Sequence, residues 1–301
     1  MTREQWLEAR RTSIGGSDSS AIVGYNPFSS PYTVWADKTG RLPEREDNEA
    51  MKQGRDLEEY VAQRWCEDTG KKVRKVNAIL FNEDYPFAHA NIDRMVVGEN
   101  AGLECKTTSV LNLQRFKDGD YPNSYYIQCM HYLAVTGLDR WYLAVLVLNK
   151  ALYTYTIERD EEAIAALMQM ESDFWRYVEN DTPPPMDGEI PTTDALKTIY
   201  SGVQEGTIEL YGRQPLIEEY YAEQTAIKVH EKKIEQIKQI LRDDLGTLTD
   251  GYTDDYKVTN RECSKQVFQF ADFQADYPDI DLSGYYKTSV YKTFKITKKG
   301  K

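Results

Sequence analysis

The feature that most constrains this chain is the fourteen-residue stretch from Asp93 to Lys106, in which two short segments flank a turn. Gly98-Glu99-Asn100 has the composition of a tight turn, so the flanking segments are predicted to pair as a β-hairpin. Because side chains alternate along a strand, Glu104 and Lys106 are expected on one face and Cys105 on the other. Two carboxylates and an ammonium near a sheet edge can hold a divalent metal and orient an attacking water. This is the chemistry needed for phosphodiester hydrolysis.

The length and composition of the chain are those of an ordinary globular protein. Its 301 residues, 41% of them hydrophobic, suffice for one large domain or for a domain with an appendage. No apolar run approaches the roughly 20 residues needed to span a bilayer, and the N-terminus lacks the apolar stretch of a secretory signal. The four cysteines are scattered, which argues against a disulfide framework and against a zinc or iron–sulfur site. We therefore expect a cytoplasmic protein.

The net charge of -12 argues against a simple nucleic-acid-binding protein, because phosphate contacts need lysine and arginine. It does not exclude a nuclease, since metal ligands are acidic and a local basic channel can coexist with an acidic exterior. Two basic patches occur, at residues 71–75 and at the C-terminus, where six lysines and no acids follow Asp281. Taken alone, each patch is better explained as a solvated face than as a DNA contact.

Hydrophobic periodicity and turn residues predict a chain of mixed α/β (α+β) type. The expected helices are 3–11, a short helix around 21–23, 32–38, 49–69 capped by Gly70, 124–136 stopped by Gly137, 160–180, and a helix of about thirty residues ending at Gly246. The expected strands are 73–81, 88–97, 102–107, 141–148, 152–158, and a C-terminal ribbon made of 256–260 and 285–297.

The run Pro183-Pro184-Pro185 is the clearest domain boundary and divides the chain into residues 1–188 and 189–301. Beyond it, Tyr220, Ile227, Ile234 and Leu241 recur every seven residues and form a narrow apolar seam. Polar residues interrupt the neighbouring row, so a sustained two-stranded coiled coil is not expected. This region could grip duplex DNA, dock an annealing protein, mediate self-association, or only stabilise the rest of the chain.

Two further features lie outside the hairpin. Glu58 follows Gly54 in the predicted helix 49–69, where it could ligate a metal directly or through water, or be an ordinary surface acid. Gln128 and Tyr132 lie four residues apart on one helical face, where both can direct hydrogen bonds outward to a phosphate backbone. His131 between them is better explained as a packed residue than as a general base.

These motifs occur together in an order that resembles a known family. Asp93 and Glu104-Cys105-Lys106, preceded by Gly54-x-x-x-Glu58 and followed by Gln128-x-x-x-Tyr132, resemble the PD-(D/E)xK nuclease superfamily. The resemblance is closest to the YqaJ-type viral recombinases, which are related to phage lambda exonuclease. It extends over about residues 1–180 and includes matches at 6–10, 14–18 and 138–142. It implies a restriction-endonuclease-like core, with a central mixed sheet flanked by helices, and a long helix and β-ribbon as a C-terminal appendage.

The resemblance also implies roles for individual residues. Asp93 and Glu104 would be the central metal ligands, the carbonyl of Cys105 would complete their shell, and Glu58 would bind a second ion. Lys106 would orient the water or neutralise charge that develops on the phosphate. The implied cofactor is Mg²⁺, as two ions, with Mn²⁺ as a possible substitute.

A second group of residues would hold the 5′-phosphate of a DNA end. By resemblance these are Arg10, Ser17 and Gln128, with Tyr132 beside them. Arginine suits a phosphate because its planar fork donates two parallel hydrogen bonds. Asn91-Ile92 stands where relatives often have Ser or Thr and then Pro, and Asn91 can still donate to a phosphate.

The function implied is a magnesium-dependent 5′→3′ exonuclease that resects one strand of linear duplex DNA for recombination by single-strand annealing. Such a protein would be encoded by a phage or prophage, form a trimeric ring, act on double-stranded DNA ends, and pass the surviving strand to a single-strand annealing protein, without a membrane partner. The alternatives are a PD-(D/E)xK endonuclease, a Cas4-like nuclease and a non-catalytic DNA-binding scaffold. The scattered cysteines disfavour the Cas4 type, and retention of Asp93, Glu104 and Lys106 together disfavours the scaffold. The metal centre alone does not determine polarity.

Overall fold

The computed structural model describes residues 10–44, 47–202, 204–289 and 294–297. The chain divides into two compact units, Met1–Gln204 and Glu205–Lys301, so the division falls later than the boundary predicted at 188/189. The predicted helix 3–11 lies outside the described residues except for Arg10 and Arg11, which are helical. No helix in the described ranges is both long and apolar enough to cross a membrane.

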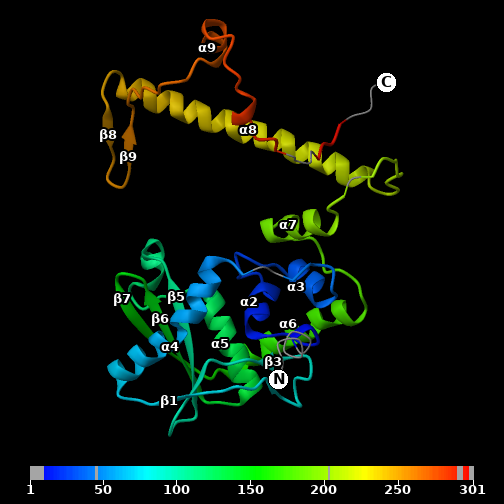
Figure 1. Cartoon of the computed structure of the whole chain (residues 1–301), viewed down its shortest axis with the longest axis vertical. Helices are drawn as coiled ribbons and strands as arrows, with labels where there is room; N and C mark the ends of the chain where they lie inside the picture. The colour runs from blue at the N-terminus through cyan, green and yellow to red at the C-terminus, as the bar shows by residue number, and fades with distance from the viewer. Residues whose placement is uncertain (1–9, 45–46, 203, 290–293, 298–301) are drawn as a thin grey trace. The chain divides into compact units, whose positions relative to one another are not determined.

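A five-stranded mixed sheet forms the centre of the first unit (Figure 1). Its order is β1 (Val73–Lys75), β4 (Arg94–Val96), β5 (Ala101–Thr108), β6 (Arg140–Val147) and β7 (Ala151–Glu158). Strands β5 and β6 are parallel, and every other neighbouring pair is antiparallel. The chain crosses from β5 to β6 through the 3₁₀ helix η1 (Val110–Phe116) and the helix α5 (Asn123–Thr136). This sheet confirms the predicted fold class.

The strand predictions upstream of β5 were too long. The expected strand 73–81 is two elements, β1 and β2 (Leu80–Phe81), and the expected strand 88–97 is β3 (His89–Ala90) followed by β4. Strands β2 and β3 pair with each other in a separate small sheet. The chain therefore leaves and re-enters the main sheet between β1 and β4, which a continuous apolar pattern does not reveal.

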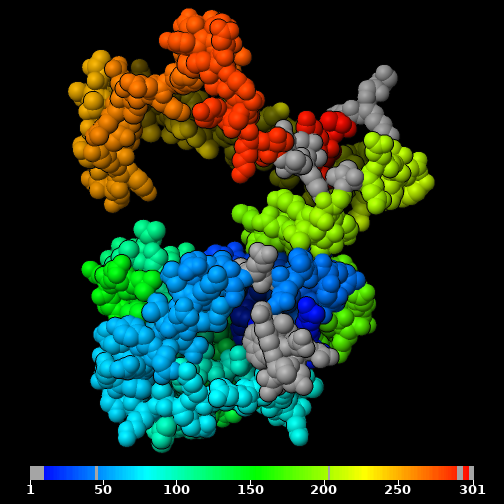
Figure 2. All heavy atoms as spheres, viewed as in Figure 1, coloured from blue at the N-terminus to red at the C-terminus, as the bar shows by residue number. Residues whose placement is uncertain are grey.

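The two faces of the sheet are covered by different helices. Alternate residues of β6, such as Leu143 and Val145, pack in one core with α5, whereas Tyr142 and Ala144 pack on the opposite face with Trp65 of α4 (Glu49–Thr69). Helix α4, pale blue, lies over the near face of the sheet in Figure 1 and on the near surface in Figure 2. This period-two alternation places every residue of β5 on either the α4 side or the α5 side.

Local capping sets the ends of α4 and α5 where the sequence predicts them. The Asn48 side chain accepts a hydrogen bond from the backbone N–H of Met51, which satisfies one of the free donors of the first turn of α4. Gly70 after α4 and Gly137 after α5 both have φ of 70°, the left-handed conformation that glycine adopts without a steric penalty. The predicted helices 49–69 and 124–136 are confirmed.

A second core lies beside the sheet and contains α2 (Gly16–Ile22), α3 (Pro31–Lys38), α6 (Glu161–Glu179) and α7 (Ile190–Ile199). Helix α7 was not predicted. It packs on α3, where the Thr192 hydroxyl donates to Ser30 Oγ at 2.7 Å, and Ala195 is buried. These contacts explain why the first unit continues beyond the proline run.

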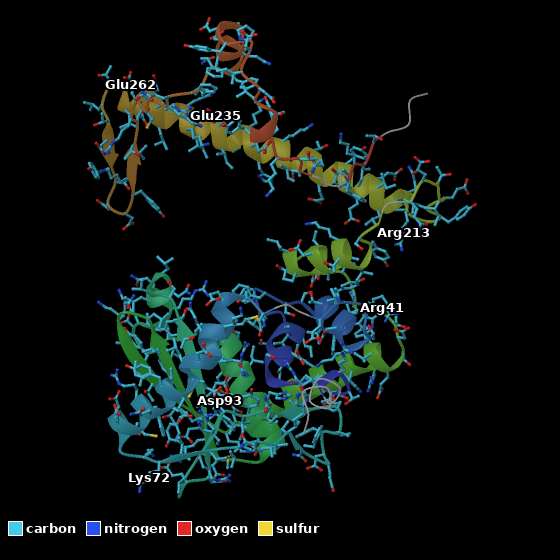
Figure 3. The ribbon with its side chains drawn as sticks, in the orientation of Figure 1. Arg41, Lys72, Asp93, Arg213, Glu235 and Glu262 are labelled. Atoms are coloured by element: carbon cyan, nitrogen blue, oxygen red, sulfur yellow. The ribbon has the colours of Figure 1, made fainter. Side chains whose placement is uncertain are left out.

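The second unit contains the long helix α8 (Gln214–Leu245), which confirms the predicted helix ending at Gly246. None of its residues is buried, and the side chains project around the whole helix, including that of Glu235 (Figure 3). The predicted strand 256–260 contains β9 (Lys257–Thr259), but β9 pairs with the adjacent β8 (Asp250–Tyr252) rather than with the predicted segment 285–297. The described residues from 285 onward contain no strand; α9 (Phe270–Asp276) and η2 (Ser283–Tyr285) lie before or at the start of that segment.

Candidate active site

Asp93 and Glu104 meet where β4 pairs with β5, as the hairpin pattern predicts (Figure 3 labels Asp93). Asp93 Oδ2 accepts a hydrogen bond from the backbone N–H of Cys105 at 2.9 Å. Glu104, only 3% exposed, points to the α5 side. Its Oε1 lies 2.6 Å from Lys106 Nζ and accepts a hydrogen bond from Gln128 Nε2 at 2.8 Å. The predicted carboxylates and lysine therefore lie together.

The second oxygen of Glu104 identifies a place for a cation. Glu104 Oε2 is buried and has no hydrogen-bond partner among the described residues. An ionised oxygen that is withdrawn from water without a partner is costly, and a hard divalent cation is the partner that carboxylate oxygens favour. The Asp93 carboxylate is close enough to raise that cost by repulsion. The residues present therefore fit a divalent metal.

The charges of the site act on one another strongly. Burial, then the charges of Glu104 and Glu58, raise the pKa of Asp93 well above its ordinary value. Burial by itself would lower the pKa of Lys106, but the carboxylates of Glu104 and Asp93 raise it above its ordinary value. Without a metal, Lys106 is therefore an ammonium, which can donate hydrogen bonds and offset negative charge.

Cys105 contributes its backbone rather than its thiol. Its side chain lies on the α4 side with Leu103, opposite Glu104. Burial, and then the charges of Asp93 and Glu104, raise the pKa of the Cys105 thiol, so the sulfur stays protonated and is a poor metal ligand. The carbonyl of Cys105 stays the predicted donor.

Gln128 and Tyr132 do not point outward, contrary to the geometric expectation. They are only 8% and 5% exposed, because α5 lies against the sheet and this helical face is turned toward Glu104. Gln128 Nε2 donates to Glu104 Oε1 and also to the Tyr132 hydroxyl at 2.8 Å, and that hydroxyl donates to the carbonyl of Asn91 at 3.2 Å. Gln128 therefore connects the carboxylate site to the backbone at Asn91, a residue whose side chain is exposed.

The glycine turn before α2 lies against the same two residues of α5. Ser17 is exposed at the start of α2, next to Gly16. Lys38 Nζ lies 2.6 Å from Asp18 Oδ2 and donates to the carbonyl of Arg10 at 2.6 Å. Burial alone would raise the pKa of Asp18, but Lys38, the backbone N–H of Gly15 and the charge of Arg10 lower it below its ordinary value. The structure thus brings Arg10 and Ser17 to one turn beside α5.

Gly16 packs so closely against α5 that a side chain at this position should lower the stability of the protein. A Cβ on Gly16 would lie 2.6 Å from Cε1 of Tyr132 and 3.0 Å from Cγ of Gln128, both on buried side chains. We expect Gly16→Ala to lower the free energy of unfolding by about 1–3 kcal/mol, as overpacking does. Gly54→Ala is the matched control, since its Cβ meets only Thr107 Oγ1 at 3.8 Å within a helix and should stabilise by roughly 0.5–1 kcal/mol. Urea unfolding of both variants tests this; equal effects would contradict it.

Glu58 does not join the other two carboxylates in this structure. Its Oε1 lies 2.5 Å from Nη1 of Arg94, a residue that sequence reasoning missed. Within the described parts of the chain, no group of three or more His, Cys, Asp or Glu side chains lies close enough together to hold a metal. Side-chain alternation along the strand could have predicted this contact, because the residue after Asp93 faces the opposite side of the sheet, toward α4 and Glu58.

Half of the basic residues in the patch at 71–75 are neutralised by ion pairs. Lys71 forms an ion pair with Glu99 and Lys75 pairs with Glu59 at 2.7 Å, while Lys72 and Arg74 are exposed. These contacts agree with the interpretation of the patch as a solvated face.

Comparison with known proteins agrees with this fold. The sequence model of the YqaJ-like viral recombinase domain matches residues 5–139. The uncharacterized protein YqaJ of Bacillus subtilis (strain 168) is 34% identical over 286 residues, which cover 93% of this chain and 90% of that protein. Among solved structures, LHK-Exo in complex with dAMP superposes with a TM-score of 0.52 at 22% identity, and the alkaline exonuclease LHK-Exo from Laribacter hongkongensis superposes with a TM-score of 0.50 at 21% identity. Each match covers 59% of this chain and 93% of the other, and shows a shared fold.

Proposed function

Because the chain belongs to the YqaJ-like viral recombinase family, we propose that it is a divalent-metal-dependent exonuclease that acts on duplex DNA ends during recombination. The observation that carries this proposal is the buried, unpartnered Oε2 of Glu104 beside Asp93, among the residues that the structure describes. Such an arrangement is unfavourable in a protein that only binds DNA and useful in one that binds a metal. The description of LHK-Exo as an alkaline exonuclease, and its complex with dAMP, are consistent with it.

We assign the metal to Asp93, Glu104 and the carbonyl of Cys105, and a second ion to Glu58. When bound, Mg²⁺ (or Mn²⁺ in its place) supplies Lewis-acid stabilisation of charge at the scissile phosphate. The Lys106 ammonium would donate to a phosphate oxygen or to the attacking water, which offsets the charge that develops in the transition state. Gln128 holds Glu104 Oε1, and Oε2, which accepts no hydrogen bond from the described residues, would be the oxygen that binds the metal.

We further propose that the strand is degraded in the 5′→3′ direction. Arg10 and Ser17 would bind the terminal 5′-phosphate, with Asn91 and Tyr132 beside them, and Gln128 would join them by turning toward the phosphate the amide hydrogen that it donates to Tyr132. This proposal is supported by the position of these residues near one another. The glycine turn that carries Ser17 packs on Gln128 and Tyr132, and Lys38 connects the backbone of Arg10 to Asp18 in the same turn. A phosphate held there would lie next to the carboxylate site rather than far from it.

The test uses the full chain, Mg²⁺ and three DNA substrates: linear duplex with 5′-phosphates, the same duplex with 5′-hydroxyls, and a closed circle. We expect loss of one strand from the phosphorylated linear DNA, slower loss from the hydroxyl form, and an intact circle. Cleavage of the circle would indicate an endonuclease, and DNA binding without hydrolysis would indicate a scaffold.

Arg10→Ala should reduce the preference for a 5′-phosphate by roughly tenfold, because a charge-assisted contact to the terminal phosphate is lost. Arg11→Ala is the matched control, since Arg11 is the exposed neighbour on the same short helical segment. The ratio of rates on phosphorylated and hydroxyl ends is the measurement. Equal ratios for Arg10→Ala and the wild type would remove Arg10 from the end-binding site.

Family membership also supports two assembly proposals: a trimeric ring around the DNA, and transfer of the surviving strand to a single-strand annealing protein. We propose that the nuclease activity resides in residues 1–188 and that 189–301 is an appendage, although its first helix, α7, belongs to the first compact unit. The mass of the assembly in solution, from light scattering after size-exclusion chromatography, tests the ring.

A further inference from the structure

Arg94 is a buried cation immediately next to the proposed metal site. Its side chain is only 4% exposed, and its guanidinium has three oxygen partners. Nη1 lies 2.5 Å from Glu58 Oε1 and donates to the carbonyl of Asp93 at 2.7 Å, while Nη2 lies 3.2 Å from Glu59 Oε2. A charge buried this deeply needs such partners, so Arg94 holds Glu58 strongly.

The direction in which Arg94 points explains where Glu58 lies. Arg94 pairs across the sheet with Leu103, whose side chain belongs to the core on the α4 side. Asp93, one residue earlier, points instead to the backbone N–H of Cys105 and to the side of Glu104. Two consecutive residues thus act on different sides: Asp93 lies in the metal site, and Arg94 retains Glu58 toward α4.

Glu58 is nevertheless within electrostatic reach of the metal site. The same Arg94 Nη1 contacts Glu58 Oε1 at 2.5 Å and the carbonyl of Asp93 at 2.7 Å, so the Glu58 carboxylate lies close to Asp93. A divalent cation at Asp93 and Glu104 would therefore attract the same carboxylate that Arg94 binds. Since Arg94 holds Glu58 through Oε1, movement of this carboxylate toward a cation must weaken or share that contact.

We propose that Arg94 competes with the metal for Glu58, so that Glu58 joins the metal site only when it shares or gives up its ion pair with Arg94. This rests on the proposed function, since it takes Asp93 and Glu104 as metal ligands. Arg94 is thus a positioning residue: it touches neither substrate nor metal and acts through Glu58. Arg94 therefore weakens the binding of the ion that needs Glu58. The ion held by Asp93 and Glu104 does not depend on this carboxylate and is the more tightly bound of the two.

Manganese binding to the full-length protein without DNA tests the proposal, with free Mn²⁺ measured by electron paramagnetic resonance. Arg94→Met removes the guanidinium, so the Glu58 carboxylate is released to join the ion. We expect the dissociation constant of the weaker ion to fall about tenfold. Arg64→Met on the same helix as Glu58 is the matched control, because Arg64 contacts Tyr60 and Glu67 at the surface, and it should change nothing. An unchanged or weaker affinity in Arg94→Met would overturn the proposal.

A double-mutant cycle separates competition for Glu58 from a general charge effect. In a Glu58→Gln background, Arg94→Met should no longer tighten manganese binding, because the contested carboxylate is gone. A gain that survives Glu58→Gln would overturn the proposal, since Arg94 would then act on Asp93 and Glu104 directly. Should Arg94→Met not yield folded protein, Arg94→Lys replaces it, with an expected gain of about threefold because lysine lacks the planar fork; no gain would again overturn the proposal.

The same titrations distinguish this inference from the proposed function. Glu104→Gln should weaken binding of the tighter ion in every background. If manganese binding does not depend on Glu104, the proposed function fails. If it depends on Glu104 but not on Arg94, only the inference about Arg94 fails.

Discussion

Asp93→Asn is expected to abolish nuclease activity and, at the same time, to make the metal-free protein more stable to heat. Activity should fall on the order of a thousandfold or more, because an amide cannot supply the ligand charge that a catalytic metal requires. Stability should rise because the introduced amide keeps an oxygen that accepts the hydrogen bond from Cys105 N–H but no longer repels Glu104 and Glu58. We expect a melting temperature in EDTA higher by roughly 2–4 °C.

The stability difference should depend on pH. Burial and neighbouring carboxylates raise the pKa of Asp93, so the folded state binds this proton more tightly than the unfolded state does. The stability that Asp93 contributes is therefore fully present at pH values below 3.8 and is lost as pH rises through the raised pKa of the folded state. The amide of the Asp93→Asn variant does not titrate, so the advantage of this variant over the wild type should be small in acid and largest above that pKa.

Mg²⁺ should reverse the order of stability, because the ion stabilises the wild type and not Asp93→Asn. Melting curves in EDTA and in Mg²⁺ at several pH values measure both effects. Asp84→Asn, at an exposed turn position, is the matched control and should leave activity and melting temperature unchanged. Activity retained by Asp93→Asn would refute the metal assignment; a lower melting temperature in EDTA at neutral pH would refute the electrostatic account.

Glu171→Met is expected to destabilise the protein by about 3–5 kcal/mol, because it leaves a buried positive charge without its partner. His131 and Glu171 are fully buried, on α5 and α6, and His131 Nδ1 lies 2.8 Å from Glu171 Oε1. His131 Nε2 donates to the carbonyl of His89 at 2.9 Å. Both ring nitrogens face acceptors, so the imidazole is held as a cation. Urea unfolding measures the loss.

The contribution of this pair should also vary with pH. Burial alone would lower the pKa of His131, but the Glu171 carboxylate and the carbonyl of His89 raise it above 6.5. The stabilisation is therefore greatest below pH 6.5 and is lost as pH rises through the raised pKa. Glu171→Gln keeps a hydrogen-bond acceptor without the charge, so it should cost only about 1–2 kcal/mol and lose this pH dependence. Equal losses for the Met and Gln variants would contradict the charged-pair account.

The sequence predicted best where short-range effects set the structure. The bounds of α4 depend on Asn48 and Gly70, and those of α5 on Gly137, which act within one turn of the helix. The same holds for α8, which ends at Gly246. Predictions failed where pairing partners had to be chosen. The segment 73–81 was divided between two sheets, and β9 paired with its neighbour β8 rather than with a distant segment.

By itself, the sequence determined that Asp93, Glu104 and Lys106 occur around a paired hairpin and that Glu104 and Lys106 share a face, because alternation and turn chemistry are local. Only the tertiary structure decided which partners each charge received. Gln128 is turned inward onto Glu104, and Glu58 is retained by Arg94, because burial between a sheet and two helices makes each ionised group depend on residues distant in sequence. Such contacts have no signature in spacing, since they depend on how α4 and α5 pack on opposite faces of one sheet.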